Sequence, residues 1–498
     1  MKRETEHKDG YGSVVKYLGM FGGAQGISML LNLLRNKVVS WLLGTVGLGL
    51  LGLYSRTVQM FSDCTNLSLS FSAVRKLSDV YENGESEELL YYVKVTRSVA
   101  FLTGVIGMLL FLFLSPFVAN FFDEEIGYSR FYLLMLAPVL LFMAVSGGEV
   151  AILRGVRRLN SLAIYTLWTS FVAIAVSLPL YFLLGFTGIM PSIFIIAFLQ
   201  MAGVLFHTLR LYRYRIAPFS WALLRDGVDM LKLGAGYIYS TMLVSCSVWI
   251  IYKVISETGG DSELGLFSAG YLILAMLPSV LFAALDSEYY PRLSASFGNN
   301  KVRDAMVNEQ LEVHLLIQVP IILAIIVVLP YLLPLLFSYE FVPAVGMTRL
   351  ALFGLLFHIM TYPISFMPLS KGDTLVFVIQ ETVYNTVNVL AVVWGYSHYG
   401  LTGAGMAMLI ARFVDLLVAY SISHFRYGFE LSYSTVKYAV VSGMLAILLV
   451  LSLFLFEGLL SWVAGVLVVA ISILFSIYSL VKYGKIWDKI LRRLKLKK

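Results

Sequence analysis

Long apolar segments separated by short polar stretches run along almost the whole chain. A helix needs ~20 predominantly apolar residues to cross the hydrocarbon core of a bilayer. Segments of this kind begin near Tyr17, Gly49, Ser98, Phe131, Leu162, Pro191, Leu231, Phe267, Leu311, Met347, Thr374, Leu401, Thr435 and Leu459. The pattern therefore predicts an all-α polytopic membrane protein with about 14 transmembrane helices.

Composition supports this class and excludes a soluble domain. Of the 498 residues, 59% are hydrophobic and only 13% are charged, whereas a soluble domain has about 25% charged residues. The mean hydropathy is +0.82. A single soluble core stops growing near ~250–300 residues, so it cannot absorb this much apolar surface.

The distribution of lysine and arginine predicts the orientation in the membrane. Most of the 37 basic residues lie in the two termini and in every second loop, for example Arg75, Lys76, Arg154, Arg157 and Lys301. Basic loops stay on the cytoplasmic side, so both termini are expected to be cytoplasmic and the number of spans even. Because the basic residues are confined to short loops and termini, the net charge of +7 does not indicate nucleic-acid binding.

Three short motifs recur in the second half of the chain at nearly one offset. The segment LGLYS at 51–55 returns as LGLFS at 264–268, and GFTG at 185–188 returns as GLTG at 400–403. The pair Arg154-Gly155 corresponds to Lys371-Gly372. Chance is the alternative, since Gly, Leu and Ser are common in spanning helices. A true repeat predicts two six-helix lobes related by an axis along the membrane normal, with two extra C-terminal helices.

This organisation divides the chain into five parts. They are an N-terminal six-helix lobe (1–213), a cytoplasmic interlobe linker (214–230), a C-terminal six-helix lobe (231–430), two extra transmembrane helices (431–481) and a basic amphipathic tail (482–498). The linker sequence FSWALLRDGVDML favours a helix lying on the membrane surface. The tail is typical of a helix that binds the lipids of an anionic leaflet, although a solvated tail is the alternative.

Four basic residues at bilayer depth indicate an anion-binding cavity. A charged side chain there costs ~2.5–3.5 kcal/mol on insertion scales, so it normally faces a bundle interior or a watery cavity. Arg35, Lys37, Arg56 and Lys253 could line one such cavity, and guanidinium pairs well with phosphate. For Lys37 and Lys253, extension to the membrane interface is the favoured interpretation, whereas for Arg35 and Arg56 contact with a ligand is favoured.

Acidic residues within the spans are candidates for ion coupling. Asp63, Glu381 and Asp415 lie in apolar segments, and Arg412 precedes Asp415 by three residues, a spacing that allows an ion pair on one helix face. A structural ion pair is the favoured interpretation of Arg412 and Asp415. The functional alternative is a proton or sodium site, because a carboxylate in a low-dielectric cavity can exchange a proton. Asp63 and Glu381 have no obvious partner in the sequence and are the better candidates for such a site. Acids near cytoplasmic span ends are expected to be solvated, namely Glu149, Asp286 and Glu288.

No motif in the chain indicates an enzyme, a cofactor or a metal site. The sequence contains no P-loop, no HExxH and no GxSxG. The two cysteines, Cys64 and Cys246, lie in apolar segments and provide neither a disulfide framework nor a metal cluster. All predicted outer loops are short, whereas a glycan-assembly enzyme usually needs a sizeable outer loop with catalytic groups.

The chain resembles the polysaccharide flippases of the multidrug/oligosaccharidyl-lipid/polysaccharide (MOP) exporter superfamily. The resemblance is carried by LLNLLRNKVVSWLLGTVGLGLLGLYS (30–55), by its echo at 264, by LDSEYYPRLSASFG (285–298) and by the layout of two lobes plus two helices. It implies alternating access in a bacterial inner membrane. The implied substrate is an undecaprenyl-diphosphate-linked oligosaccharide, and the implied partners are H+ or Na+ and the polysaccharide polymerase machinery.

Peptidoglycan-precursor flippases of this superfamily have a cationic cavity with arginines in the first two spans, which Arg35 and Arg56 match. They also place an arginine in span 8, but residues 267–285 contain no basic residue. This difference favours an O-antigen, capsule or exopolysaccharide repeat unit over lipid II.

Three alternatives remain at this stage. They are a cation-coupled small-molecule or drug antiporter of the same superfamily, a major-facilitator transporter and a glycan-assembly membrane enzyme.

Overall fold

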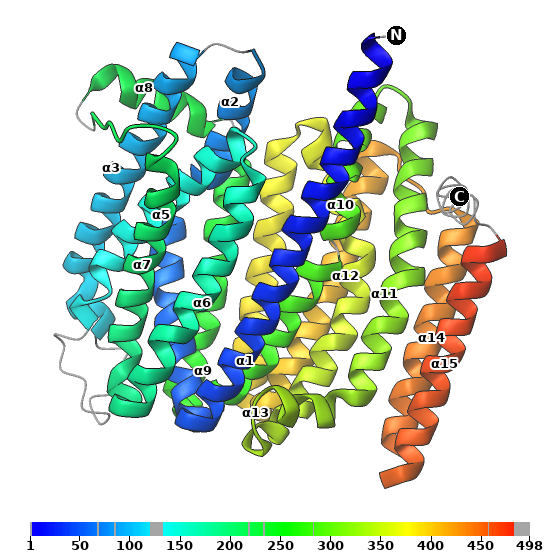
Figure 1. Ribbon diagram of the computed structural model, residues 1–498. Helices are drawn as coiled ribbons and strands as arrows, with labels where there is room; N and C mark the ends of the chain where they lie inside the picture. Colours follow the sequence, from blue (N-terminus) through cyan, green and yellow to red (C-terminus); the bar gives the residue numbers. More distant parts are fainter. Residues whose placement is uncertain are drawn as a thin grey trace. The chain divides into compact units, whose positions relative to one another are not determined.

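The chain folds into helices that form two compact units. The computed structural model describes residues 2–66, 69–83, 86–119, 133–217, 220–232, 235–281, 283–456 and 458–482. Every regular element in these ranges is a helix (Figure 1), which confirms the predicted all-α class. The first unit is Met1–Gly265 with Leu336–Ser338, and the second is Leu266–Leu335 with Tyr339–Lys498.

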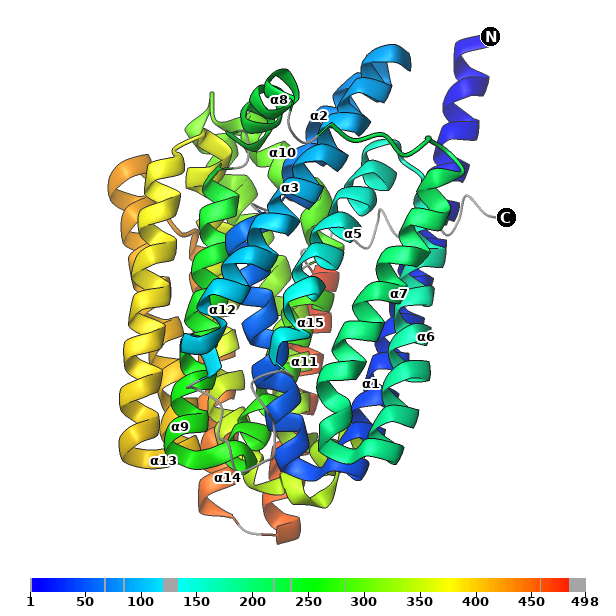
Figure 2. The ribbon, with the colours of Figure 1, turned by 90° about the vertical axis from the view of Figure 1, so that its left-hand side faces the viewer.

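The first unit contains the N-terminal helices. They are α1 (Lys2–Asn66), α2 (Leu69–Asn83), α3 (Ser86–Ala119), α5 (Ala137–Gly155), α6 (Leu159–Leu184), the short 3-10 helix η2 (Gly185–Gly188), α7 (Ile189–Leu209), α8 (Trp221–Lys232) and most of α9 (Ala235–Leu281). Helix α6 packs against both α7 and α1 (Figure 2).

The second unit begins within α9 and contains the remaining helices. They are α10 (Ala283–Ser296), α11 (Asn300–Leu336), the 3-10 helix η3 (Tyr339–Ala344), α12 (Val345–Lys371), α13 (Thr374–Tyr427), α14 (Tyr433–Leu455) and α15 (Gly458–Lys482). Helices α12 and α13 pack together, and α14 pairs with α15 (Figure 1). The C-terminal tail from residue 483 and residues 120–132, which include the predicted start of a span near Phe131, lie outside the described residues.

Ten helical segments of the described chain are long and apolar enough to cross a membrane. Four of them are 44, 51, 44 and 54 residues long, about twice the length that a bilayer requires. Each of the four is interrupted by one glycine with positive φ, at Gly44, Gly185, Gly260 and Gly400. If each of these four counts as two spans, the total is fourteen. That count and the cytoplasmic orientation of the termini stay predictions.

The positive-φ positions recur between the two halves of the chain. Gly44 and Gly260 are 216 residues apart, and Gly185 and Gly400 are 215 apart. Arg157, a non-glycine residue with positive φ, lies 215 residues before Gly372. Three matched turns at one offset support the internal repeat, because positive φ is uncommon outside glycine and marks specific turns.

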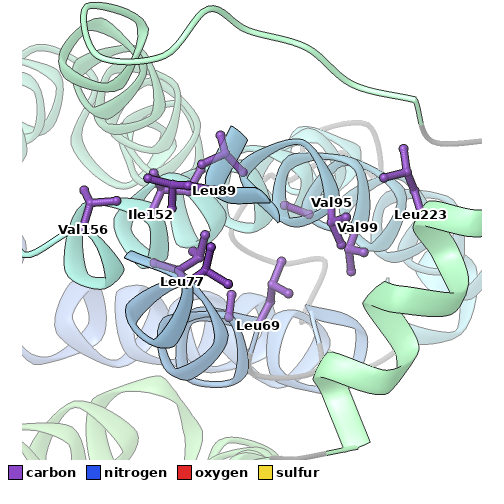
Figure 3. Close-up of a cluster of buried hydrophobic side chains, with 13 residues drawn as sticks. Leu69, Leu77, Leu89, Val95, Val99, Ile152, Val156 and Leu223 are labelled. Carbon is purple, nitrogen blue, oxygen red and sulfur yellow. The ribbon is translucent and has the colours of Figure 1, made fainter. Parts of the chain in front are cut away.

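A buried apolar cluster joins α2, α3, α5 and α8 in the first unit (Figure 3). Leu223 brings α8 onto α3, and a Cβ at Gly227 would lie 2.5 Å from the Val99 side chain. Trp221, at the start of α8, is 82% exposed. Helix α8 is therefore amphipathic and docked on the first unit, and its predicted contact with lipid remains a prediction.

Glu149 is buried, so the expectation that it is solvated is wrong. Its carboxylate accepts two hydrogen bonds from Arg97, at 2.7 Å from Nε and 3.0 Å from Nη2, and both side chains are 1% exposed. Nη1 of Arg97 also donates to the Arg213 carbonyl oxygen at 2.9 Å. Glu149 lies on the face of α5 that packs on α3, so another helix covers this end of the apolar segment. The side chains of Asp286 and Glu288 lie outside the described residues.

Candidate functional site: the interface of α1 and α9

The second half of α1 contacts α9 on both sides of the turn at Gly260 within the first unit: residues before the turn run antiparallel to it, and residues 261–265 follow the turn. We call the contact of residues 45–66 with residues 235–265 the α1–α9 interface. A Cβ at Gly265 would lie 1.9 Å from the Thr45 carbonyl oxygen, and one at Gly49 would lie 2.2 Å from the Asp261 carbonyl oxygen. Thr45 and Ser262 hydroxyls are 2.8 Å apart. Only glycine permits backbones to approach this closely, so the glycines set the distance between the two helices.

Arg56 lies at the middle of this interface. Its guanidinium carbon is 5.5 Å from the centre of the Tyr252 ring, within the range of a cation–π contact. The neighbouring Thr57 accepts a hydrogen bond of 3.0 Å from the Trp249 indole nitrogen. Lys253 places its Nζ 5.8 Å from the Trp249 ring and 3.6 Å from Glu257. The structure thus places Arg56 and Lys253 on two aromatic residues of the same α9 face.

Asp63 lies further along the same interface. Gln59, one turn earlier on α1, donates from Nε2 to both carboxylate oxygens at 2.9 Å. Ser245 of α9 donates a hydroxyl hydrogen bond to the same carboxylate. Next to this pair, the Sγ atoms of Cys64 and Cys246 are 3.8 Å apart. Polar groups therefore cross the interface at both its middle and its Asn66 end.

The other two predicted cavity residues lie on the first half of α1. Arg35 donates from Nε to the Ser177 hydroxyl of α6 at 3.1 Å. Lys37 is half-buried, and its carbonyl accepts a hydrogen bond of 2.8 Å from Ser40. The described contacts place Arg35 against α6 and place Arg56 and Lys253 at the α1–α9 interface. A single cavity shared by all four remains a prediction.

Three of the four ion-coupling candidates come together in the second unit. Arg412 and Asp415 form an ion pair of 3.3 Å, which confirms the pairing predicted from their spacing. Arg412 also donates to Nδ1 of His358 at 3.1 Å and lies 4.3 Å from the Tyr384 ring centre. Glu381 is one turn before Tyr384 on α13 and interacts electrostatically with Asp415.

A cavity of about 260 Å³ opens beside this group. It is lined by Tyr271, Leu274, Ala275, Pro278, Ala351, Leu355, His358, Tyr384, Asn388, Met408 and Arg412. Because arginine has no acceptor, Nδ1 of His358 must accept the bond from Arg412, so the imidazole proton lies on Nε2. The group can therefore hold a charged pair and neutral hydrogen-bonding partners around a small cavity.

Sequence reasoning missed the partners that lie far away along the chain. Tyr252, Ser245 and Tyr384 contact Arg56, Asp63 and Arg412, and none of them was a candidate. The hydrogen bond from Gln59 to Asp63 could have been predicted from the sequence, because Gln59 precedes Asp63 by four residues and lies on the same helix face.

Known structures with similar folds are membrane transporters. A lipid II flippase, MurJ, in an inward closed conformation matches with a TM-score of 0.68 and 16% identity, over 93% of this chain and 98% of that one. An inward-facing multidrug resistance MATE family transporter of the MOP superfamily matches with a TM-score of 0.70 and 15% identity, over 80% and 94%. A MOP superfamily transporter from Pyrococcus furiosus matches with a TM-score of 0.56 and 15% identity, over 83% and 94%.

The fold thus defines a multi-span membrane protein with the architecture of MOP superfamily transporters. The sequence profile of the polysaccharide biosynthesis protein family matches residues 14–297, more than half of the chain. The chain belongs to this family. No curated protein sequence matches it.

Proposed function

We propose that this protein moves an undecaprenyl-diphosphate-linked oligosaccharide from the inner to the outer leaflet of a bacterial inner membrane by alternating access. The oligosaccharide would be an O-antigen, capsule or exopolysaccharide repeat unit. Membership of the polysaccharide biosynthesis family and the fold shared with a lipid II flippase support the proposal. Because the step is transport, we expect the lipid-linked glycan to leave the protein chemically intact.

The observation that carries the proposal is the position of Arg56. It lies 12 residues beyond the turn at Gly44, a rise of about 18 Å along a helix. Its guanidinium is half-buried at the α1–α9 interface, over Tyr252 and one residue from the Trp249 contact. Such a guanidinium suits a diphosphate, which it can bind through paired hydrogen bonds, with Lys253 and Arg35 as further cations.

Transport of the proposed kind needs an energy source, and we propose coupling to H+ or Na+. Asp415, with Arg412 and Glu381, forms the candidate coupling group in the second unit. Asp63, held by Gln59 and Ser245, is the candidate in the first unit. Either carboxylate could bind a cation and release it when its helices move apart.

A cation-coupled small-molecule antiporter is the second candidate function. The cavity of about 260 Å³ beside Arg412 favours it, because MATE transporters share the fold and a small ligand needs such a cavity. Pockets for drug-sized ligands usually measure ~300–1,000 Å³, so this cavity is smaller than such a ligand usually needs. We therefore rank this function second.

The test is translocation of labelled undecaprenyl-diphosphate oligosaccharide in proteoliposomes. We expect Arg56→Ala to lower the initial rate at least tenfold, because a charge-assisted hydrogen bond contributes about 1.5–3 kcal/mol and each 1.4 kcal/mol is tenfold. Arg56→Lys keeps the charge and should keep part of the rate. Arg210→Ala is the matched control, since Arg210 also lies over an aromatic ring, 4.1 Å from the centre of Phe206, at the end of α7.

Equal rates in wild type, Arg56→Ala and Arg56→Lys would remove Arg56 from the mechanism. Absence of translocation by folded wild type with several glycans would favour the antiporter. Hydrolysis or joining of the glycan would instead indicate an enzyme.

A further inference from the structure

The two cysteines of the chain meet at the α1–α9 interface. Cys64 and Cys246 are the only cysteines among the 498 residues, and 182 positions separate them in sequence. Their Sγ atoms are 3.8 Å apart, and both side chains are half-buried. The fold therefore brings a pair of partly exposed thiols into contact.

Neighbouring hydrogen bonds hold the two cysteines in register. Ser245 bonds to Asp63, the residues directly before Cys246 and Cys64. Trp249, three residues after Cys246, donates to Thr57, which lies about two turns before Cys64 on α1. A disulfide has an S–S length of about 2.05 Å, so the sulfurs must approach by roughly 1.8 Å, within reach of a small side-chain rotation. The helices need not shift far for a bond to form.

We propose that Cys64 and Cys246 form a reversible disulfide under oxidising conditions and that this bond stops transport. In the reaction with hydrogen peroxide, one thiolate attacks a peroxide oxygen and forms a sulfenic acid. The second thiol then attacks the sulfenic sulfur, the S–S bond forms and water leaves. Overall, two thiols and one hydrogen peroxide give one disulfide and two waters. A low-molecular-weight disulfide can serve as oxidant instead and leaves as two thiols.

The bond would covalently join α1 to α9 one residue from Asp63 and two turns from Arg56. Alternating access requires helices that line the substrate route to move, so a covalent link at this position should arrest the cycle. The consequence for transport rests on the proposed function, whereas formation of the bond does not. The predicted orientation places the Asn66 end of α1 near the cytoplasm, where thiols are normally reduced. We therefore expect the disulfide to form only under oxidative stress, and the protein under normal conditions to be folded with both thiols reduced.

The bond is tested by mass spectrometry of unreduced peptides from the full-length protein in liposomes, after treatment with hydrogen peroxide or oxidised glutathione. We expect a peptide linked through Cys64 and Cys246 in wild type, lost on addition of dithiothreitol. Cys64→Ser and Cys246→Ser should give none, and Cys64→Ala provides a second variant if a serine variant does not fold. Failure of the link to form in folded wild type, with both thiols open to alkylation, would overturn the proposal.

Translocation is measured in the same liposomes. We expect oxidation to lower the wild-type rate at least tenfold, with recovery after dithiothreitol, and to leave Cys64→Ser unchanged. A linked protein that transports at the full rate would overturn the arrest. If the disulfide forms but the unoxidised protein transports no lipid-linked glycan, the result contradicts the proposed function and leaves the disulfide standing.

Discussion

Arginines at two places in the first unit illustrate different solutions to the burial of charge. Arg97 is neutralised by the carboxylate of Glu149, with which it forms two short hydrogen bonds. Arg56 lies over the ring of Tyr252, which attracts the cation through its π-electrons. The first arrangement suits a structural contact between helices. The second is the contact at the position where we propose that Arg56 binds an anion.

Gly265 is the residue whose substitution should most directly disturb the α1–α9 interface. A Cβ there would lie 1.9 Å from the Thr45 carbonyl oxygen, so Gly265→Ala must push the helices apart. Overpacking of this kind costs about 1–3 kcal/mol, and we expect a lower midpoint of thermal unfolding, measured by tryptophan fluorescence in detergent. Gly443→Ala in α14 is the control, because nothing lies within 4 Å of its Cβ position. An unchanged midpoint in Gly265→Ala would show that the backbones are not in contact.

Residue-level predictions from the sequence succeeded where partners share one helix. The spacing of Arg412 and Asp415 predicted their ion pair, and the spacing of Gln59 and Asp63 would have predicted theirs. Tyr252 lies 196 positions from Arg56, and no periodicity along one helix can reveal such a partner. Glu149 was placed in solvent because its apolar segment ends there, but α3 covers that end.

At the scale of elements, single glycines with positive φ interrupt four of the long apolar helical segments. Gly44, Gly185, Gly260 and Gly400 have positive φ, a conformation that costs glycine little. Hydropathy alone located the apolar segments, and the repeated motifs indicated their duplication. One turn could not be matched from the sequence: the motif paired Gly372 with Gly155, whereas the residue with positive φ in the first half is Arg157, two positions later.

The contact between α3 and α5 should depend on the Arg97–Glu149 pair. Removal of one partner of a buried pair leaves an uncompensated charge and costs about 3–5 kcal/mol. We therefore expect Glu149→Ala to unfold at a markedly lower denaturant concentration than wild type. Glu82→Ala is the matched control, because Glu82 pairs with Arg157 at an exposed site, where a salt bridge contributes about 0–1 kcal/mol. Equal losses in both variants would contradict a special role for the buried pair.

At the scale of the whole molecule, the candidate groups are divided between the two units. The first unit holds Arg35, Arg56 and Lys253, which suit an anion, together with Asp63. The second holds the Arg412–Asp415 pair and Glu381. The sequence repeats predicted two lobes, with the second beginning at residue 231. The contacts of α9 place most of that helix in the first unit, so Lys253 belongs with Arg35 and Arg56.

Coupling is a property of the whole transport cycle, and Asp415 is the residue that tests it. If Asp415 binds the driving cation, Asp415→Asn should remove the response of translocation to an imposed pH or sodium gradient while downhill movement continues. Asp415→Glu should retain part of the response. Asp373→Asn, at an acid between α12 and α13, is the control. A full gradient response in Asp415→Asn would exclude that carboxylate as the coupling site.

The boundary between the units falls inside α9, after Gly265, and this has a practical consequence for protein engineering. A gene divided at the linker before α9 would encode Arg56, Asp63 and Cys64 on one polypeptide and Tyr252, Ser245 and Cys246 on the other. The N-terminal fragment would expose an α1 surface whose glycine and polar contacts have lost their partner helix. A fragment that ends after Gly265 keeps both sides together and is the better starting point for expression of half of the transporter.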